Sequence, residues 1–289
     1  MRTSARDCST GLSFFGSERA LLQWMSRSPL AVDNPQVEGL DRAKPRTGPR
    51  LSVVIPVYNE VGTIAEVVRR VQDVSIEKEI IIVDDGSTDG TRRVLELLSP
   101  DNANQEVPSR AGWTSDNLRI LLQSKNCGKG AALRRGFQEA RGGIVIIQDA
   151  DLELDPQEYS KLIEPIERGT ADVVYGSRFL EPPRDGIPFL YLLGNKLLTQ
   201  TSNICTGMRL TDVWTGYKVF RREVLRSLEL REDRFGFEPE VTARIAKAGY
   251  RVCELPVSYA CRSRDEGKKI GWKDAVRGMW CTLRYGLFL

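Results

Sequence analysis

From Leu51 onward, hydrophobic residues alternate between short continuous runs and longer segments in which they recur every three or four positions. Continuous apolar runs bounded by polar residues are typical of buried strands, whereas the 3.6-residue period is typical of helices. The runs predict strands at Leu51–Val57, Ile80–Val83, Leu118–Leu122, Ile144–Gln148, Asp172–Tyr175 and Arg251–Pro256. The periodic segments predict helices at Gly62–Val74, Thr91–Leu98, Gly130–Ala140, Glu158–Arg168, Leu190–Thr206 and Val241–Ala248. Strands that alternate with helices favour an α/β fold with a mainly parallel sheet flanked by helices.

The two ends of the chain differ from this central part. Residues 1–50 are polar and include the X-Pro breaks Asn34-Pro35, Lys44-Pro45 and Gly48-Pro49, so we predict a disordered extension there. Residues 51–270 form the predicted single domain, with a polar insertion at about 100–117. Residues 271–289 form a predicted amphipathic helix.

The C-terminal helix separates apolar from basic residues. Its apolar face contains Trp272, Val276, Met279, Trp280, Leu283 and Leu287, and its basic face contains Lys273, Arg277 and Arg284. Such a helix suits a membrane interface, although a terminal helix more commonly packs on its own core. Because no apolar run approaches the ~18 residues of a membrane span, we expect a cytoplasmic protein, peripheral on the cytoplasmic face of the membrane.

Two carboxylates stand one residue apart where a predicted strand ends. Asp149 and Asp151 follow Ile144–Gln148, and Glu153 comes two residues later. Magnesium ions use carboxylate oxygens together with substrate phosphates, so this pair predicts a divalent-cation site, with Glu153 as a candidate third ligand. The neighbouring Asp155 has a different explanation, because it precedes Pro156 and is suited to capping the next helix.

Polar residues also follow the other predicted strands. Pro56, Tyr58 and Glu60 come with or just after the first strand, and Asp84 and Asp85 after the second. In open α/β sheets, ligands bind beyond the carboxyl ends of the strands, so we expect these residues to converge there. Lys129, in a glycine-flanked turn before a helix, is either a ligand contact or an ordinary solvated lysine.

Composition narrows the chemistry. The chain has no histidine, which excludes Ser–His and Cys–His nucleophile pairs and histidine-ligated zinc. Its six cysteines include no CxxC pair, which favours a reducing compartment. A net charge of +3 gives no indication of nucleic-acid binding.

Several motifs occur together in one order. They are Ile55–Glu60, Val83–Thr91, Asn126–Ala132, Asp149–Asp151, Gly176–Phe179, Thr215–Lys218 and Gly267–Ile270. In this order and spacing the chain resembles the family 2 glycosyltransferases, and within them the branch of dolichyl- and polyprenyl-phosphate mannose and glucose synthases. The resemblance implies a GT-A, Rossmann-like fold and an inverting transfer of a hexose from UDP-glucose or GDP-mannose to a polyprenyl or dolichyl phosphate.

The resemblance also implies roles for individual residues. Asp84 and Asp85 would face the nucleotide, and Asp149 and Asp151 would hold Mg²⁺ or Mn²⁺ on the diphosphate, with Glu153 as a further ligand. The cations expected around the phosphates are Arg178, Lys218 and Arg262.

The nucleophile separates the alternatives. A phosphate monoester is already largely dianionic at pH 7 and needs cations rather than a base. A sugar hydroxyl needs a general base, and Glu238 or Glu240 would then serve. A saccharide acceptor therefore stays open, as does a non-catalytic nucleotide-sugar-binding protein. A dinucleotide-binding enzyme is excluded, because no glycine fingerprint follows the first strand.

Overall fold

The computed structural model describes residues 49–100, 117–181, 189–261 and 272–288. Its centre is a seven-stranded sheet with the order β3-β2-β1-β4-β6-β5-β7. The strands are β1 (Leu51–Val57), β2 (Lys78–Asp84), β3 (Leu118–Leu122), β4 (Ile144–Ile147), β5 (Val173–Ser177), β6 (Lys218–Arg221) and β7 (Val252–Pro256). All neighbouring pairs are parallel except the two made by β6, which runs antiparallel to β4 and β5. The predicted α/β, GT-A-like sheet is confirmed.

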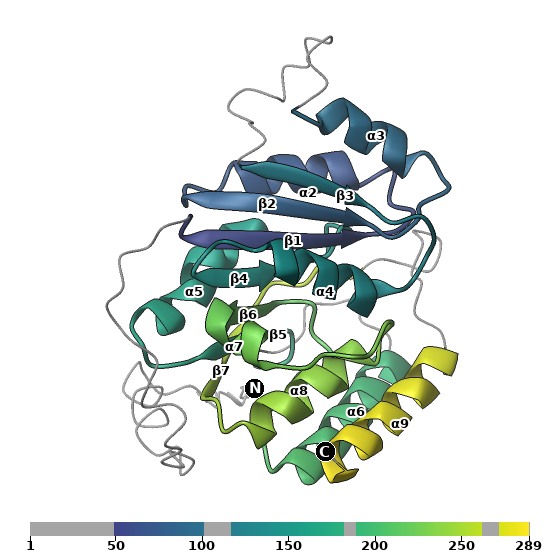
Figure 1. Ribbon diagram of the computed structural model, residues 1–289. Coiled ribbons are helices and arrows are strands. Elements are labelled where there is room, and N and C mark those ends of the chain that lie inside the picture. Colours follow the sequence, from purple (N-terminus) through teal and green to yellow (C-terminus); the bar gives the residue numbers. More distant parts are fainter. Residues whose placement is uncertain (1–48, 101–116, 182–188, 262–271, 289) are drawn as a thin grey trace, which may run out of the picture. The chain divides into compact units, whose positions relative to one another are not determined.

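Helices cover both faces of this sheet (Figure 1). They are α2 (Ile64–Gln72), α3 (Thr91–Leu98), α4 (Lys129–Glu139), the short 3₁₀ helix η2 (Pro156–Glu158), α5 (Tyr159–Glu167), α6 (Phe189–Thr206), α7 (Arg222–Ser227), α8 (Phe237–Lys247) and α9 (Trp272–Phe288). None of the described helices combines the length and the apolar character needed to cross a membrane.

Alternation along the strands divides the interior into two cores. Val53 and Ile55 of β1 pack with α2, α3 and α5, whereas Val54 between them packs with α4, α7 and α8. Successive side chains of a strand point to opposite faces, so a strand buried on both sides reads as one continuous apolar run. This explains why the strands of the first half were predictable from the sequence.

Two parts of the second half differ from the sequence-based prediction. The Lys218–Arg221 strand and the α7 helix that follows it were not predicted, because a four-residue strand with a charged residue at each end carries no apolar run. Helix α8 begins at Phe237 rather than Val241, so that Glu238 and Glu240 lie buried in its first turn. Pro239 is compatible with that first turn, where its missing N–H has no intrahelical partner to lose.

The C-terminal helix packs by a face other than the apolar one. Helix α9 buries Gly278, Cys281, Thr282 and Tyr285 against its neighbours α6 and α8. Four of the residues in the predicted apolar face are exposed instead: Val276, Trp280, Leu283 and Leu287. The backbone of α9 approaches closely where its glycines lie, since a Cβ on Gly278 would fall 2.1 Å from the Trp214 ring.

Most of the predicted N-terminal extension, residues 1–48, lies outside the described residues, as do most of the predicted insertion and Arg262 with Gly267–Ile270. The boundaries assigned to these segments stay predictions.

Candidate active site

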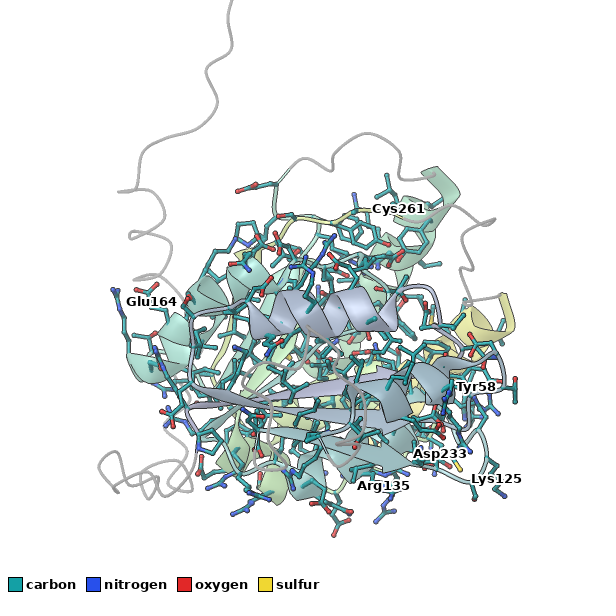
Figure 2. The ribbon with its side chains drawn as sticks, turned by 90° about the horizontal axis from the view of Figure 1, so that it is seen from above. Tyr58, Lys125, Arg135, Glu164, Asp233 and Cys261 are labelled. Atoms are coloured by element: carbon teal, nitrogen blue, oxygen red, sulfur yellow. The ribbon has the colours of Figure 1, made fainter. Side chains whose placement is uncertain are left out.

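Hydrogen bonds join the loops that follow β1, β2 and β4. The Asn59 N–H donates to Ser87 Oγ (3.0 Å), and the Asn59 side-chain oxygen accepts from the Thr88 N–H (2.8 Å). The Thr63 hydroxyl donates to the Ala150 carbonyl oxygen (2.7 Å), across to the acidic loop after β4. Figure 2 shows Tyr58, Lys125 and Asp233 at one end of the sheet, with Glu164 at the other. The strand-end residues therefore form one edge, as predicted for this topology.

Pro56, Tyr58 and Glu60 are half-buried at this edge. The Glu60 carboxylate accepts a hydrogen bond from the Thr63 hydroxyl (2.9 Å), and the Glu60 N–H donates to Thr91 Oγ1 (2.9 Å). Glu60 thus links the start of α2 to the start of α3.

Asp84 is fully buried and holds the turn that follows β2. Its carboxylate accepts the N–H groups of Gly86 and Ser87 (each 3.2 Å to Oδ2) and pairs with Arg92 Nε (2.7 Å). Both carboxylate oxygens of Asp84 already accept hydrogen bonds. Any contact of Asp84 with a nucleotide would therefore be made in addition to these bonds.

Asp85 connects the turn after β2 to the loop that begins α4. It accepts the N–H groups of Cys127 and Gly128 (each 2.7 Å) and the side-chain amide of Gln123 (2.9 Å). Burial raises the pKa of Asp85, and the two backbone N–H groups oppose that shift. Asp85 therefore fixes the backbone just before Lys129.

Lys129 lies between two acidic groups of the site. Its ammonium nitrogen is 2.8 Å from Asp149 Oδ1 and 3.3 Å from Glu238 Oε1. Burial alone would lower the pKa of Lys129, but Asp149 and Glu238 together hold it above its ordinary value. The lysine is thus a charged member of the site, and the alternative of an ordinary solvated lysine is not what the geometry gives.

Gly216 makes room for the other side of Asp149. A Cβ built on Gly216 would lie 2.1 Å from Asp149 Oδ2, closer than real side chains approach one another. The glycine of the Thr215–Lys218 motif is therefore required by the position of a carboxylate that follows a different strand.

The described residues contain no cluster of three or more Asp, Glu, Cys or His side chains able to hold a metal ion. Glu153 accepts a hydrogen bond from the Tyr259 hydroxyl (3.0 Å), and Asp151 Oδ1 accepts the Glu153 N–H (3.2 Å). Leu152 between them has φ +62°, a left-handed conformation that is uncommon for a branched residue. Asp149 and Asp151 supply two carboxylates in one loop, so a divalent cation completed by substrate phosphates fits the residues present.

Glu238 is shared by two lysines. Besides Lys129, it pairs with Lys218, whose side chain is fully buried. The Lys218 ammonium also donates to the carbonyl oxygens of Val213 (3.0 Å) and Thr215 (2.6 Å). Burial lowers the pKa of Lys218, with Glu238 opposing that shift. The Lys218 ammonium group has three N–H bonds, and Glu238 and the two carbonyl oxygens accept all of them. Lys218 therefore influences the site by holding Glu238 in place.

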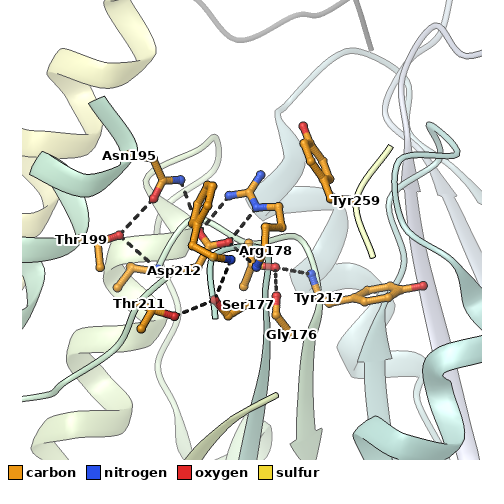
Figure 3. Close-up of polar contacts among 12 residues, drawn as sticks. Gly176, Ser177, Arg178, Asn195, Thr199, Thr211, Asp212, Tyr217 and Tyr259 are labelled. Atoms are coloured by element: carbon orange, nitrogen blue, oxygen red, sulfur yellow. Dashed lines mark hydrogen bonds and ion pairs between the residues drawn. The ribbon is translucent and has the colours of Figure 1, made fainter. Parts of the chain in front are cut away.

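Arg178 is held by a buried carboxylate that the sequence did not indicate (Figure 3). Its Nε and Nη2 donate to the two oxygens of Asp212 (2.7 and 2.9 Å), and Nη1 donates to the Tyr191 hydroxyl (2.9 Å). Arg178 is 8% exposed and Asp212 0%, so this is a buried bidentate ion pair.

Aromatic rings surround the same guanidinium. The rings of Phe179, Tyr191 and Tyr259 lie 5.3, 5.9 and 5.1 Å from the Arg178 carbon Cζ. Cations are attracted to aromatic faces at such distances. Because the Tyr259 hydroxyl also donates to Glu153, this ring connects Arg178 to the acidic loop after β4.

Glu254 of β7 is a second residue that the sequence did not indicate. Its carboxylate accepts the N–H groups of Thr211 (2.8 Å) and Asp212 (3.1 Å) and so fixes the loop that supplies Asp212. Burial raises the pKa of Glu254 to about 7, although the two N–H groups oppose the shift. The available signal for Glu254 in the sequence was a single acidic residue within the otherwise apolar strand β7.

Comparison with known proteins agrees with this architecture. The sequence profile of Glycosyl transferase family 2 matches residues 52–229. A polyprenol monophosphomannose synthase of Mycolicibacterium smegmatis is 30% identical over 248 residues, which cover 83% of this chain and 88% of the relative. An undecaprenyl-phosphate mannosyltransferase of Micrococcus luteus is 29% identical, with 77% of this chain and 88% of the relative covered.

Among solved structures, a glucosyl-3-phosphoglycerate synthase of Mycobacterium tuberculosis in complex with phosphoglyceric acid superposes with a TM-score of 0.60. It is 21% identical, and 84% of this chain and 82% of that chain are covered, a likeness that concerns the fold. The profile match and the relatives identify the chain as a glycosyltransferase that belongs to glycosyl transferase family 2, in the branch that contains the polyprenyl-phosphate mannose synthases.

Proposed function

We propose that this protein transfers a hexose from a nucleotide sugar to a polyprenyl phosphate, with inversion at the anomeric carbon, and that the reaction depends on Mg²⁺ or Mn²⁺. The observation that carries this proposal is the engagement of both candidate bases, Glu238 and Glu240. Glu238 is occupied by Lys129 and Lys218. Neither carboxylate faces outward to take a proton from a sugar hydroxyl.

Glu240 is fully buried and is occupied within the protein. It accepts the N–H groups of Arg231 (2.9 Å) and Glu232 (2.7 Å) and pairs with Arg244 (3.0 Å). A hydroxyl acceptor needs a base within hydrogen-bond reach, whereas a phosphate dianion needs only to be positioned. The arrangement therefore favours a phosphate nucleophile over the saccharide alternative.

In the proposed step, an oxygen of the polyprenyl phosphate forms a bond to the anomeric carbon as the bond to the nucleoside diphosphate breaks. The negative charge moves from the attacking phosphate to the leaving diphosphate, so no proton has to be removed. A divalent cation bound by Asp149 and Asp151 would offset the charge on that diphosphate. Lys129 adds a fixed positive charge at the same place, in a half-buried setting where electrostatic stabilisation is strong.

For the acceptor phosphate, we propose Arg178 and Arg262 as its cationic contacts. Asp212 fixes the orientation of the Arg178 guanidinium. The guanidinium lies against the Tyr259 ring, and the Tyr259 hydroxyl donates to Glu153 of the acidic loop. Arg262 lies outside the described residues, so its role is proposed from the sequence resemblance. For the donor, we propose GDP-mannose or UDP-glucose, with GDP-mannose first, because both relatives compared above are named for mannose.

We further propose that α6 and α9 associate peripherally with the membrane that contains the acceptor. Helix α6 buries the polar residues Asn195, Thr199 and Ser202 and exposes Leu193, Leu197 and Ile204. Helix α9, packed against it, exposes Val276, Trp280, Leu283 and Leu287. Both helices thus turn apolar side chains outward, which is the arrangement expected of a lipid-facing surface.

Charge supports a lipid surface as the occupant of this face. The two helices carry Lys196, Lys273, Arg277 and Arg284 but a single acidic residue, Asp274. Flotation with phosphatidylglycerol-containing vesicles tests this. The Trp280→Ser and Leu287→Ser double variant should lose vesicle binding, whereas Leu122→Ser, which changes an exposed leucine on the edge strand β3, should keep it. Equal flotation of both variants would contradict the proposed face.

The central experiment is transfer from radiolabelled GDP-mannose or UDP-glucose to polyprenyl phosphate in detergent, with Mg²⁺ or with EDTA. We expect metal-dependent label in the lipid fraction. Asp151→Asn should reduce that label by about a hundredfold or more, a size typical of a lost electrostatic contact in a transition state. The matched control is Asp73→Asn, an exposed surface aspartate. Label transferred to a saccharide hydroxyl, or unchanged turnover in EDTA, would contradict the proposal.

A further inference from the structure

Glu232 is a buried carboxylate that the proposed chemistry does not use. It lies between α7 and α8 and is 7% exposed. Both of its oxygens are engaged by the C-terminal helix α9: Tyr285 donates its hydroxyl to Oε1 (3.0 Å), and Arg277 Nη2 lies 3.2 Å from Oε2. One side chain therefore connects α9 to the stretch that precedes α8.

The side chain of Glu232 contacts α9, whereas its backbone contacts a different helix, α4. The Glu232 carbonyl oxygen accepts from Arg134 Nη1 (2.6 Å), and the neighbouring Asp233 carbonyl oxygen accepts from the Ala131 N–H (3.0 Å). The approach is very close, since a Cβ on Gly130 would lie 2.1 Å from the Glu232 carbonyl oxygen. The stretch is thus packed directly on the first turn of α4.

That first turn carries Lys129, whose ammonium group lies between Asp149 and Glu238. Gly128, just before it, is fixed by Asp85 (2.7 Å), and a Cβ on Gly128 would lie 2.3 Å from the Asp233 carbonyl oxygen. Because the turn is held by the Asp85 carboxylate on one side and by the backbone of residues 232–233 on the other, a shift of residues 232–233 moves Lys129 rather than being absorbed in free space.

We propose that Glu232 is a positioning residue that couples the seating of α9 to the geometry of Lys129, and thereby sets the affinity for a nucleoside diphosphate. The proposal rests on the proposed function in one respect, namely that Lys129 contacts the donor. It gives α9 a second role, since the helix that carries the exposed apolar face also supports the donor side of the site.

Two variants test this coupling in lipid-free solution. Glu232→Gln removes the ion pair with Arg277, and Tyr285→Phe removes one hydrogen bond while leaving the loop sequence intact. The matched control is Glu229→Gln, an exposed glutamate of the same stretch that pairs with Arg231 on the surface. Should Glu232→Gln fail to fold, Tyr285→Phe still tests the proposal.

The first measurement is hydrogen–deuterium exchange across residues 128–133 of the free protein. Exchange should be faster in both variants and unchanged in Glu229→Gln, because the Ala131 amide is bonded to the Asp233 carbonyl. The second measurement is calorimetric binding of GDP and UDP with Mn²⁺. Their Kd values should rise about fivefold or more, the lower end of usual coupling between sites.

Unchanged exchange in α4 together with unchanged Kd values, even with a lower Tm, would overturn the coupling and leave Glu232 as a purely structural ion pair. If the wild-type protein binds neither GDP nor UDP, the proposed donor class fails. The exchange measurement then still decides whether α9 and α4 are coupled, because it needs no ligand.

Discussion

The Lys129 ammonium nitrogen lies 2.8 Å from Asp149 Oδ1, so a protein cation stands beside the carboxylate that we propose as a metal ligand. Asp149 and Glu238 hold the pKa of Lys129 above its ordinary value against the effect of burial. The acidic site is therefore already partly neutralised before any metal or donor binds. A divalent ion arriving at Asp149 meets a positive charge, and their repulsion opposes its binding until the donor diphosphate arrives.

Replacement of Lys129 by Met should therefore separate metal binding from catalysis. In the absence of donor, Mn²⁺ binding measured by electron paramagnetic resonance should tighten by about tenfold, because a repulsion worth roughly one pKa unit is removed. Turnover should fall, because the donor loses a cation. The control is Lys125→Met, an exposed lysine in the preceding loop. Weaker Mn²⁺ binding in Lys129→Met would show that the lysine supports the metal instead of competing with it.

Gly216→Ala should damage the site without unfolding the protein. The added Cβ would meet Asp149 Oδ2 at 2.1 Å, and the carboxylate must move away. A displacement of about 1 Å in a catalytic group can cost on the order of a hundredfold in rate. The measurement is kcat/KM for the donor beside the Tm. Gly194→Ala in α6, where a Cβ meets nothing within 4 Å, is the control and should retain full activity.

The Arg178–Asp212 pair can be tested by a double-mutant cycle. Arg178→Met leaves a buried carboxylate without its partner, which typically costs about 3–5 kcal/mol of unfolding free energy. Adding Asp212→Asn removes that isolated charge and should restore much of the loss in urea denaturation. Acceptor turnover should stay low in both proteins, because the guanidinium is absent from both. Recovery of turnover in the double variant would exclude Arg178 from the acceptor site.

Glu254 should make stability depend on pH near neutrality. Its folded pKa is about 7, raised by burial from an ordinary value of 4.5. Between these two values the folded protein binds more protons than the unfolded chain, so the free energy of unfolding decreases as pH rises. The contribution of this group is complete below about pH 4.5 and is lost above about pH 7, with a size of up to about 3 kcal/mol.

The comparison that checks this is chemical denaturation of the wild-type protein and Glu254→Gln at pH 5, 6, 7 and 8. Gln cannot titrate, so the variant should show a flatter profile over this range. Two profiles with the same slope would mean that Glu254 is already ionised at pH 5.

The acidic motifs and the parallel strands of the first half could be predicted from the sequence. A strand buried on both faces is a continuous apolar run, and its carboxyl end fixes the edge at which following residues emerge. The amino-acid pattern alone therefore places Asp84, Asp85, Asp149 and Asp151 at one edge of the sheet. Asp155 was also correctly predicted as a cap, since its carboxylate accepts the Gln157 N–H at 3.0 Å.

The partners of the charged residues could not be predicted, because they come from distant parts of the chain. Arg178 and Asp212 are separated by 34 positions, and Glu232 and Tyr285 by 53. Periodicity describes which face of an element is apolar, but it carries no information about which side chain of another element lies opposite. The same limit applies to β6. Its four residues show no strand pattern in the sequence, and they form a strand because they pair with β4 and β5.

Helix α9 illustrates the division most clearly. The sequence by itself determined that one face is apolar and another basic, together with the chemistry of the strand-end carboxylates. Only the tertiary structure decided that α9 packs through Gly278, Cys281 and Tyr285 and leaves Trp280 exposed. The physical reason is close packing: small residues let the α9 backbone approach Trp214 and α6, and burial follows the fit between surfaces as well as the hydrophobicity of a face.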